Sequence, residues 1–237
     1  MYEPFVIRAP FFEFGPKAYL YGEKMLKLAQ AIDEAAIRYD VDVILTPQYT
    51  DIPLIAQNTR RVLVFAQHMD PLPVGRGLGA VLPEAVRAAG AVGVMLGHAE
   101  KPLDHKTLQE TIRRADQVGL ASIVCASTVE EVEAVARMGP NLIVAEPTEL
   151  IGTGQASSAA YVRSTIESVR AVDPRIMVLQ GAGITNAEDV YRVIRLGAMG
   201  TGCTSGIIQA EDPAAMAEQM LCALRRAWDE NQKSEAS

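Results

Sequence analysis

Short apolar runs alternate with helical patterns along the whole chain. Because these runs are apolar on both faces, they are typical of parallel strands buried beneath helices. They occupy 5–8, 43–47, 62–67, 92–97, 121–126, 141–146, 176–181 and 199–204. Helical patterns predict helices between the runs, and five of them cover 23–39, 108–119, 129–139, 161–172 and 187–197.

Residues that begin and end helices support these boundaries. Thr128 and Asn186 precede Val-Glu-Glu and Ala-Glu-Asp, as N-capping residues do at the start of a helix. Gly119, Gly139 and Gly197 stand where a glycine commonly terminates a helix. The helical assignments therefore rest on their ends as well as on their periodicity.

Eight strands in strict alternation with about eight helices predict the α/β class and a single (β/α)8 barrel. We expect one domain over residues 1–230 and a polar tail over 231–237 that frays. No stretch has the composition of a linker between two smaller domains. An open doubly wound sheet is the alternative, but it usually has fewer strands and often a glycine fingerprint after the first, which is missing here.

Composition and charge restrict the partners. The 237 residues are 49% hydrophobic and 22% charged, which is typical of a globular protein. The net charge of −7 disfavours a nucleic-acid or anionic-membrane partner, since either calls for basic patches. A bound phosphate would therefore have to be held locally, by backbone amides and one or two cations.

The cysteines and the N-terminal sequence indicate a soluble cytoplasmic protein. The chain has three cysteines, Cys125, Cys203 and Cys222, with no CxxC spacing, which argues against a disulfide framework or a zinc site. The first residues lack the basic and apolar regions of a signal peptide. No apolar stretch approaches the roughly 20 residues that a membrane span needs.

Two polar residues directly follow buried strands and are candidates for catalysis, because barrel enzymes build their sites at the carboxyl ends of the strands. His98 follows the fourth strand and precedes an expected helical turn, whose dipole would favour a neutral imidazole. Glu146 ends the sixth strand, where burial would raise its pKa and suit it to proton abstraction. The structural alternatives are a packed histidine and a rim salt bridge. His68 and His105 are weaker candidates.

Glycines and a lysine indicate an anion site near these two residues. Gly152 and Gly154 end the segment 147–154, which has a proline entry and an apolar tip, as a hinged lid would. Loops after strands seven and eight of such barrels often bind phosphate through backbone amides. The residues there are Gly181, Gly183, Thr204 and Ser205. Lys17 follows the first strand, which borders strand eight in a closed barrel, and supplies a cation.

These residues together resemble the triosephosphate isomerase family, and most closely its short archaeal-type branch. The matching stretches are Gly97-His98-Ala99-Glu100-Lys101, Ala145-Glu146-Pro147, Leu150-Ile151-Gly152-Thr153-Gly154, Thr46-Pro47-Gln48, Ala66-Gln67-His68 and Gly181-Ala182-Gly183-Ile184. The likeness extends over roughly residues 40 to 215, and more loosely over the whole chain. It implies a TIM barrel that acts on a small phosphorylated sugar without a metal or an organic cofactor.

The resemblance implies a role for each candidate. His98 would be the electrophile, Glu146 the base and Lys17 the group that stabilises negative charge, with Glu100 beside the lysine. This family is the standard example of a glutamate base paired with a neutral histidine, and of a lid that closes over substrate. Amides of Gly152, Gly183, Thr204 and Ser205 would bind phosphate. The family also implies a homo-oligomer, either a dimer or a tetramer.

Several positions depart from the family pattern. The family has Asn-x-Lys on its first strand, whereas here Gly15 replaces the asparagine that contacts substrate. Ala99 and Lys101 replace a serine and an arginine. Leu78 lies in a loop that lacks the threonine which the family inserts into a partner's site. These departures leave two alternatives to triose phosphate isomerisation. One is isomerisation of a tetrulose phosphate, and the other is a non-catalytic phosphate-binding barrel, although retention of His98, Glu146 and Lys17 counts against the latter.

Overall fold

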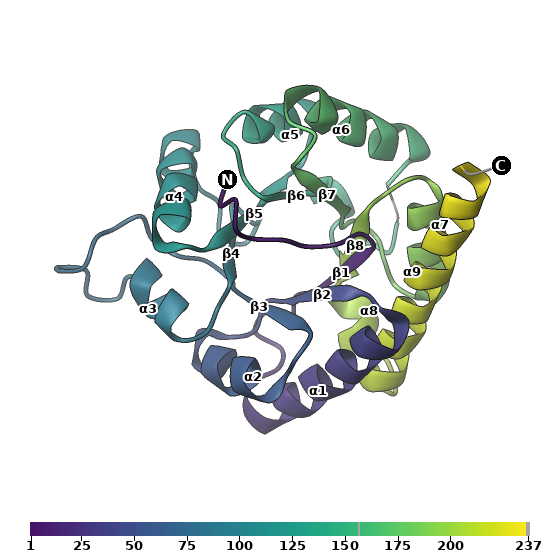
Figure 1. Cartoon of the computed structure of the whole chain (residues 1–237), viewed down its shortest axis with the longest axis horizontal. Helices are drawn as coiled ribbons and strands as arrows, with labels where there is room; N and C mark the ends of the chain where they lie inside the picture. Colours follow the sequence, from purple (N-terminus) through teal and green to yellow (C-terminus); the bar gives the residue numbers. More distant parts are fainter. Residues whose placement is uncertain (156, 236–237) are drawn as a thin grey trace.

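A computed structural model of the chain describes residues 1–155 and 157–235. Figure 1 shows a ring of strands at the centre of the molecule, surrounded by helices. Eight parallel strands pair in chain order, and β8 pairs with β1 to close the barrel. The predicted single (β/α)8 barrel is confirmed, whereas the division at residue 230 stays a prediction.

Strands and helices alternate along the chain. The strands are β1 (Phe11–Phe14), β2 (Asp42–Leu45), β3 (Val62–Ala66), β4 (Gly93–Leu96), β5 (Ala121–Ala126), β6 (Leu142–Ala145), β7 (Met177–Gln180) and β8 (Gly200–Cys203). The helices are α1 (Gly22–Tyr39), α2 (Ile52–Asn58), α3 (Pro83–Ala88), α4 (His105–Val118), α5 (Val129–Ala136), α6 (Ala159–Val172), α7 (Ala187–Arg195), α8 (Ser205–Ile208) and α9 (Pro213–Glu235). Two 3₁₀ turns, η1 (Tyr49–Asp51) and η2 (Thr148–Leu150), follow β2 and β6.

The first strand was predicted wrongly. The run 5–8 is not a strand, and β1 lies six residues later, between β2 and β8. The N-terminal segment instead crosses the end of the barrel that faces the viewer in Figure 1. Phe5 and Ile7 pack there against the apolar interior, with the ring of Phe5 edge-on to Phe65. Burial against the end of the barrel therefore gave this segment the same apolar pattern that a central strand has.

The predicted helix ends are confirmed where the structure records caps. The Thr128 hydroxyl accepts from Glu131 N–H, and the Glu131 carboxylate accepts from Thr128 N–H, which forms a capping box. The Asn186 side chain accepts from the first turn of α7. Gly119 ends α4 with a φ of 77°, a left-handed conformation that glycine adopts at no steric cost.

Alternation along the strands decides what faces the barrel interior. Successive side chains of a strand point to opposite faces, so residues two apart share a face. Phe12 and Phe14 pack in the layer between sheet and helices, whereas Phe11 packs inside the barrel with Ile44, Leu142, Val144 and Leu179. Toward the carboxyl ends of the strands, the inward-facing positions continue from Phe11 to Glu13 and Gly15, and from Leu142 and Val144 to Glu146. The layer of the interior nearest these ends is therefore polar.

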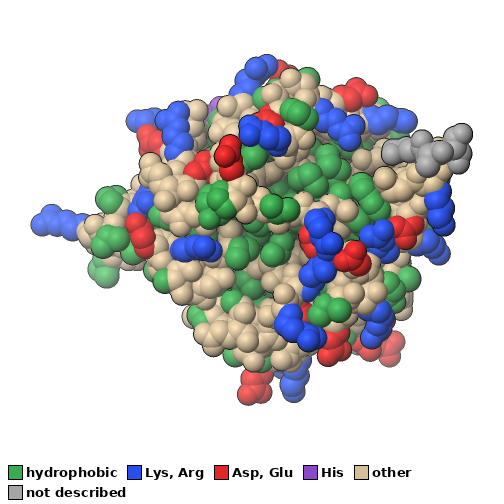
Figure 2. Space-filling view, in the orientation of Figure 1, with side chains coloured by type: hydrophobic (Ala, Val, Ile, Leu, Met, Phe, Trp, Pro, Cys, Tyr) green, Lys and Arg blue, Asp and Glu red, His purple; other side chains and the backbone are tan. Residues whose placement is uncertain are grey.

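The connection between β3 and α3 projects from the body of the barrel (Figure 1). Figure 2 shows hydrophobic side chains on this projection. Val74 and Leu78 are exposed there, and Leu78 lies completely in solvent. The projecting connection therefore presents two large apolar side chains to solvent.

The C-terminal helix α9 packs along α7 and α1. It includes residues 231–235 of the segment that was predicted to be a tail, and residues 236–237 lie outside the described residues. The side-chain amide of Asn231 donates to the carbonyl of Ile194 at 2.7 Å, which attaches this part of α9 to α7. Within the described ranges, no helix is both long and apolar enough to cross a bilayer.

Candidate active site

The carboxyl ends of the strands surround a cavity of about 480 Å³. Every residue proposed from the sequence for the site lines it. They are Gly15, Lys17, His98, Glu100, Glu146, Gly152, Gly181, Gly183, Thr204 and Ser205. His68 also lines the cavity, whereas His105 is exposed at the start of α4. Barrel closure therefore brings together side chains that are far apart along the chain.

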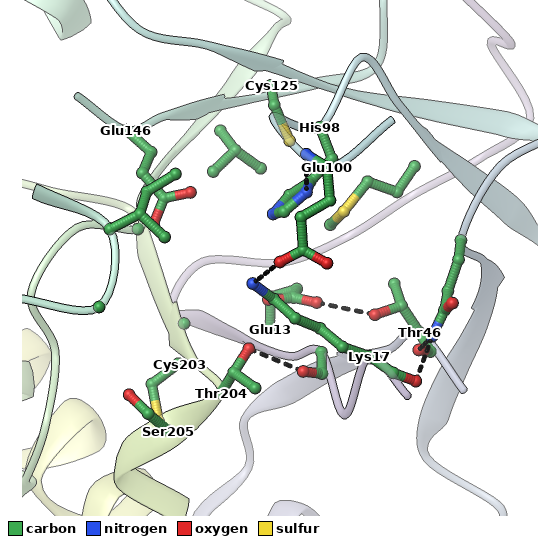
Figure 3. A pocket seen from close by; sticks show the side chains of 18 of the residues that line it. Glu13, Lys17, Thr46, His98, Glu100, Cys125, Glu146, Cys203, Thr204 and Ser205 are labelled. Atoms are coloured by element: carbon green, nitrogen blue, oxygen red, sulfur yellow. Dashed lines mark hydrogen bonds and ion pairs between the residues drawn. The ribbon is translucent and has the colours of Figure 1, made fainter. Parts of the chain in front are cut away.

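Lys17 reaches into the cavity from the loop after β1, as Figure 3 shows. Its Nζ lies 2.5 Å from Oε1 of Glu100, which confirms the pairing expected of these two residues. Its backbone has a φ of 49°, in the left-handed region that non-glycine residues seldom occupy. The side-chain amides of Gln48 and Gln67 both donate to the Lys17 carbonyl, at 2.7 and 2.9 Å, and hold the backbone in this conformation.

The surroundings of His98 favour a neutral imidazole that can donate a hydrogen bond. The residues after it form a single turn, closed by Lys101 N–H on the His98 carbonyl, and α4 begins only at His105. Within this turn the Glu100 N–H donates to His98 Nδ1 at 3.0 Å, so the neutral ring carries its proton on Nε2. Burial lowers the pKa of His98 below its usual 6.5, and the nearby charge of Lys17 lowers it further.

Glu146 continues the inward-facing series of β6 and lies across the cavity from Lys17 (Figure 3). Its N–H donates to the Ala126 carbonyl at 3.0 Å, which extends the pairing of β5 and β6 and fixes its backbone. Burial raises the pKa of Glu146 above its usual 4.5, although the positive charge of Lys17 partly offsets this effect. A carboxylate with a raised pKa in a partly enclosed site is suited to removing a proton from carbon.

Gly181 leaves room for that carboxylate. A Cβ at this position would lie 3.2 Å from both Cδ and Oε1 of Glu146. The Gly181 N–H already donates to the Ala145 carbonyl at 3.3 Å in the ladder between β6 and β7. Gly181 is therefore better placed to leave space for the Glu146 carboxylate than to bind phosphate, the role expected from the sequence.

The loops after β1 and β8 are joined at the opposite side of the cavity. Thr204 Oγ1 donates to the Gly15 carbonyl at 2.7 Å. Gly152 and Gly183 both have left-handed backbones, with φ values of 74° and 71°. Within the described ranges their N–H groups form no hydrogen bond, so both are available to an anion in the cavity.

Sequence reasoning missed several residues that line this cavity, above all Glu13 and Cys125. Glu13 is only 9% exposed, and burial raises its pKa to about 8. Its signal was visible in the sequence, since it is the single charged residue within Phe11–Phe14. Because the first strand was assigned to 5–8, that charge was not recognised as an inward-facing one.

A profile of the triosephosphate isomerase family matches residues 15–220 of the chain. The triosephosphate isomerase of Methanobacterium bryantii is 39% identical over 195 residues, which covers 81% of this chain and 86% of the relative. That of Methanothermus fervidus is 36% identical over 203 residues, covering 84% and 91%. That of Sulfurisphaera tokodaii is 34% identical over 228 residues, covering 94% and 99%. The barrel, the composition of its cavity and these matches agree, and the chain belongs to the triosephosphate isomerase family.

Proposed function

We propose that this protein interconverts dihydroxyacetone phosphate and glyceraldehyde 3-phosphate through an enediolate. The observation that carries the proposal is the presence of Glu146, His98 and Lys17 around one cavity. The names of the relatives favour the triose substrate over the tetrulose phosphate and non-catalytic alternatives.

The three side chains divide the chemistry. Glu146 removes a proton from the carbon beside the substrate carbonyl, and its protonated carboxyl group then returns a proton to the neighbouring carbon of the enediolate. His98 donates from Nε2 to the carbonyl oxygen, which polarises it, and then moves protons between the two oxygens of the enediolate. Lys17 stabilises the negative charge that develops on those oxygens. Such preorganised donors and charges lower the barrier because they need no reorganisation when charge develops.

The phosphate is bound on the side of the cavity formed by the loops after β6, β7 and β8. The free N–H groups of Gly152 and Gly183 point to this role, together with Thr204 and Ser205 at the start of α8. The segment 147–154 closes over the bound substrate and excludes water, which protects the enediolate from loss of phosphate.

Turnover of glyceraldehyde 3-phosphate by the pure protein tests this function. We expect formation of dihydroxyacetone phosphate in a coupled assay, with a much lower kcat/KM for a tetrulose phosphate. A higher kcat/KM for the tetrulose phosphate would contradict the triose assignment. Binding of phosphate without turnover of either sugar would contradict an enzymatic role.

The space beside Gly181 leads to a first prediction. No left-handed backbone is recorded at Gly181, so alanine fits its conformation, but the new Cβ must displace the Glu146 carboxylate by a few tenths of an ångström. We expect Gly181→Ala to lower kcat about tenfold, because proton abstraction depends steeply on position. Steady-state kinetics measure this, with thermal unfolding as the check on folding. A kcat equal to that of the wild type would mean that Glu146 is not positioned by this contact.

The raised pKa of Glu146 leads to a second prediction. Glu146 acts as a base only when ionised, so kcat/KM should fall about tenfold per pH unit below its raised pKa. Burial lowers the pKa of His98 from its usual 6.5, which moves protonation of the imidazole to lower pH. Protonation of Glu146 should therefore give an acid limb with a midpoint above pH 4.5. A profile that stays flat down to pH 4.5 would contradict the raised pKa.

The proposal extends to the setting of the enzyme, a homo-oligomer in the cytoplasm. The solvent-exposed Leu78 on the projecting loop supports association with a second copy. Three free cysteines are compatible with a reducing compartment. Sedimentation equilibrium of the wild type and of Leu78→Asp tests whether the protein associates through Leu78. If the aspartate variant associates as the wild type does, the interface lies elsewhere.

A further inference from the structure

Glu13 is a buried acid inside the barrel for which the proposed mechanism has no role. It faces the interior one layer above Phe11, and its side chain lies on the floor of the cavity beneath Lys17 (Figure 3). The Thr46 hydroxyl donates to its Oε1 at 3.1 Å. Within the described part of the chain, no donor contacts Oε2. One carboxyl oxygen is thus held by the protein and the other is free to meet a ligand.

Two glycines create the space for this carboxyl group. A Cβ on Gly15 would lie 3.0 Å from Glu13 Oε1 and 3.2 Å from Thr46 Oγ1. A Cβ on Gly202, the partner of Glu13 in the ladder between β1 and β8, would lie 2.6 Å from the Glu13 carbonyl oxygen and 3.0 Å from Oε2. Neither glycine has a left-handed backbone, so what they provide is room.

Glu13 lies beside a position at which this chain departs from its family. Position 15 carries glycine where the family pattern has the asparagine that contacts substrate. The Glu13 carboxyl group lies 3.0 Å from the point at which a side chain at position 15 would begin. A side chain at 15 would therefore enter the space beside this carboxyl group, which would have to shift by a few tenths of an ångström.

The charges around Glu13 favour a protonated carboxyl group at neutral pH. Burial raises its pKa to about 8, with a smaller contribution from the Glu146 carboxylate at the end of β6. The hydroxyl of Thr46 and the charge of Lys17 act in the opposite direction. Among the described residues, the Cys125 thiol on β5 also lines the cavity, and burial raises its pKa. The Cys203 thiol on β8 packs against Met220 of α9, and burial raises its pKa as well. A protonated carboxyl group can donate a hydrogen bond, as an asparagine amide does.

We propose that Glu13 contacts the substrate in place of the missing asparagine, donating a hydrogen bond from Oε2 to a substrate oxygen beside Lys17. This inference rests on the proposed isomerase function. Above pH 8 the carboxyl group ionises, and a negative charge then faces the developing enediolate. Loss of the donor and repulsion of the enediolate both lower the rate.

Four variants test the proposal: Glu13→Gln, Glu13→Ala, Gly15→Asn and the double variant Glu13→Ala/Gly15→Asn. Each of the two single changes Glu13→Ala and Gly15→Asn should lower kcat/KM about 10- to 100-fold, the first by removing a donor and the second by crowding Glu13. The double variant restores the family arrangement and should recover most of that loss. If the losses in kcat/KM of the two single variants simply add in the double variant, the proposal that Glu13 takes the place of a side chain at position 15 is overturned.

The pH profile separates this role from a merely structural one. Wild-type kcat/KM should decline above pH 8, and this decline should be absent in Glu13→Gln, which is isosteric and cannot ionise. Glu167→Gln, at an exposed position on α6, is the matched control and should keep the wild-type profile. An alkaline limb that persists unchanged in Glu13→Gln would overturn the proposal.

Binding of 2-phosphoglycolate, an enediolate analogue, distinguishes this inference from the proposed function. Its Kd should rise above pH 8 in the wild type and not in Glu13→Gln. If the wild type binds the analogue with this pH dependence but turns over no triose phosphate, the isomerase function fails and the Glu13 contact stands. If the wild type is active and both proteins bind alike across the pH range, the Glu13 contact fails alone.

Discussion

Glu146→Asp is expected to lower kcat by about 10²- to 10³-fold, with little change in KM. The substitution keeps the charge but withdraws the carboxylate by one methylene, about 1 Å or more from the carbon it must deprotonate. Proton transfer by a positioned base is that sensitive to distance, because the reacting atoms must be close to contact before the step begins. Binding of phosphate, which depends on backbone amides and not on this carboxylate, should be preserved.

Glu167→Asp is the matched control for this experiment, since the same methylene is removed at an exposed position on α6. Its kcat should equal that of the wild type. Thermal unfolding of both variants shows whether the fold is intact, and calorimetry with 2-phosphoglycolate shows whether the site still binds an anion. Unchanged turnover in Glu146→Asp would remove Glu146 from the mechanism.

Lys17→Met is expected to reduce kcat/KM by about 10²- to 10³-fold or more, because it removes a positive charge placed beside the developing enediolate. Methionine is unbranched and similar in length, so it tests the charge while leaving most of the volume filled. The charge of Lys17 also lowers the pKa values of Glu146 and His98. Its loss should therefore shift the acid limb of any residual activity to higher pH.

Lys24→Met provides the comparison, since Lys24 is exposed on the outer helix α1. That variant should retain full activity and an unchanged acid limb. A mild effect of Lys17→Met, within about threefold of the wild type, would mean that another group stabilises the enediolate. In that case Lys101, which also lines the cavity, would be the next residue to test.

The sequence was informative wherever local rules determine the structure. Thr128, Asn186 and Gly119 mark helix ends because capping depends on a few neighbouring atoms. His98 and Glu146 were identifiable because each follows an apolar run directly, and the closed barrel brings all such strand ends to one rim. This reasoning needed only the order of the elements and not their packing.

Features that depend on distant contacts could not be read in this way. Phe5 and Ile7 have the pattern of a strand but pack, partly buried, against the end of the barrel, which no local rule reveals. The left-handed backbone of Lys17 depends on Gln48 and Gln67, which come from two other strands. The carboxyl group of Glu13 depends on the absence of side chains at Gly15 and Gly202. Apart from Gly15, the neighbours that decide each case are remote in sequence.

The way in which Lys17 is held has a consequence for redesigning the enzyme. Its carbonyl accepts from amides that follow β2 and β3, and the adjacent Gly15 carbonyl accepts from Thr204 after β8. The first loop is therefore not an interchangeable module that could be transplanted between barrels to alter specificity. A graft whose backbone followed a different path would lose these three contacts to neighbouring strands, so these positions must be exchanged together.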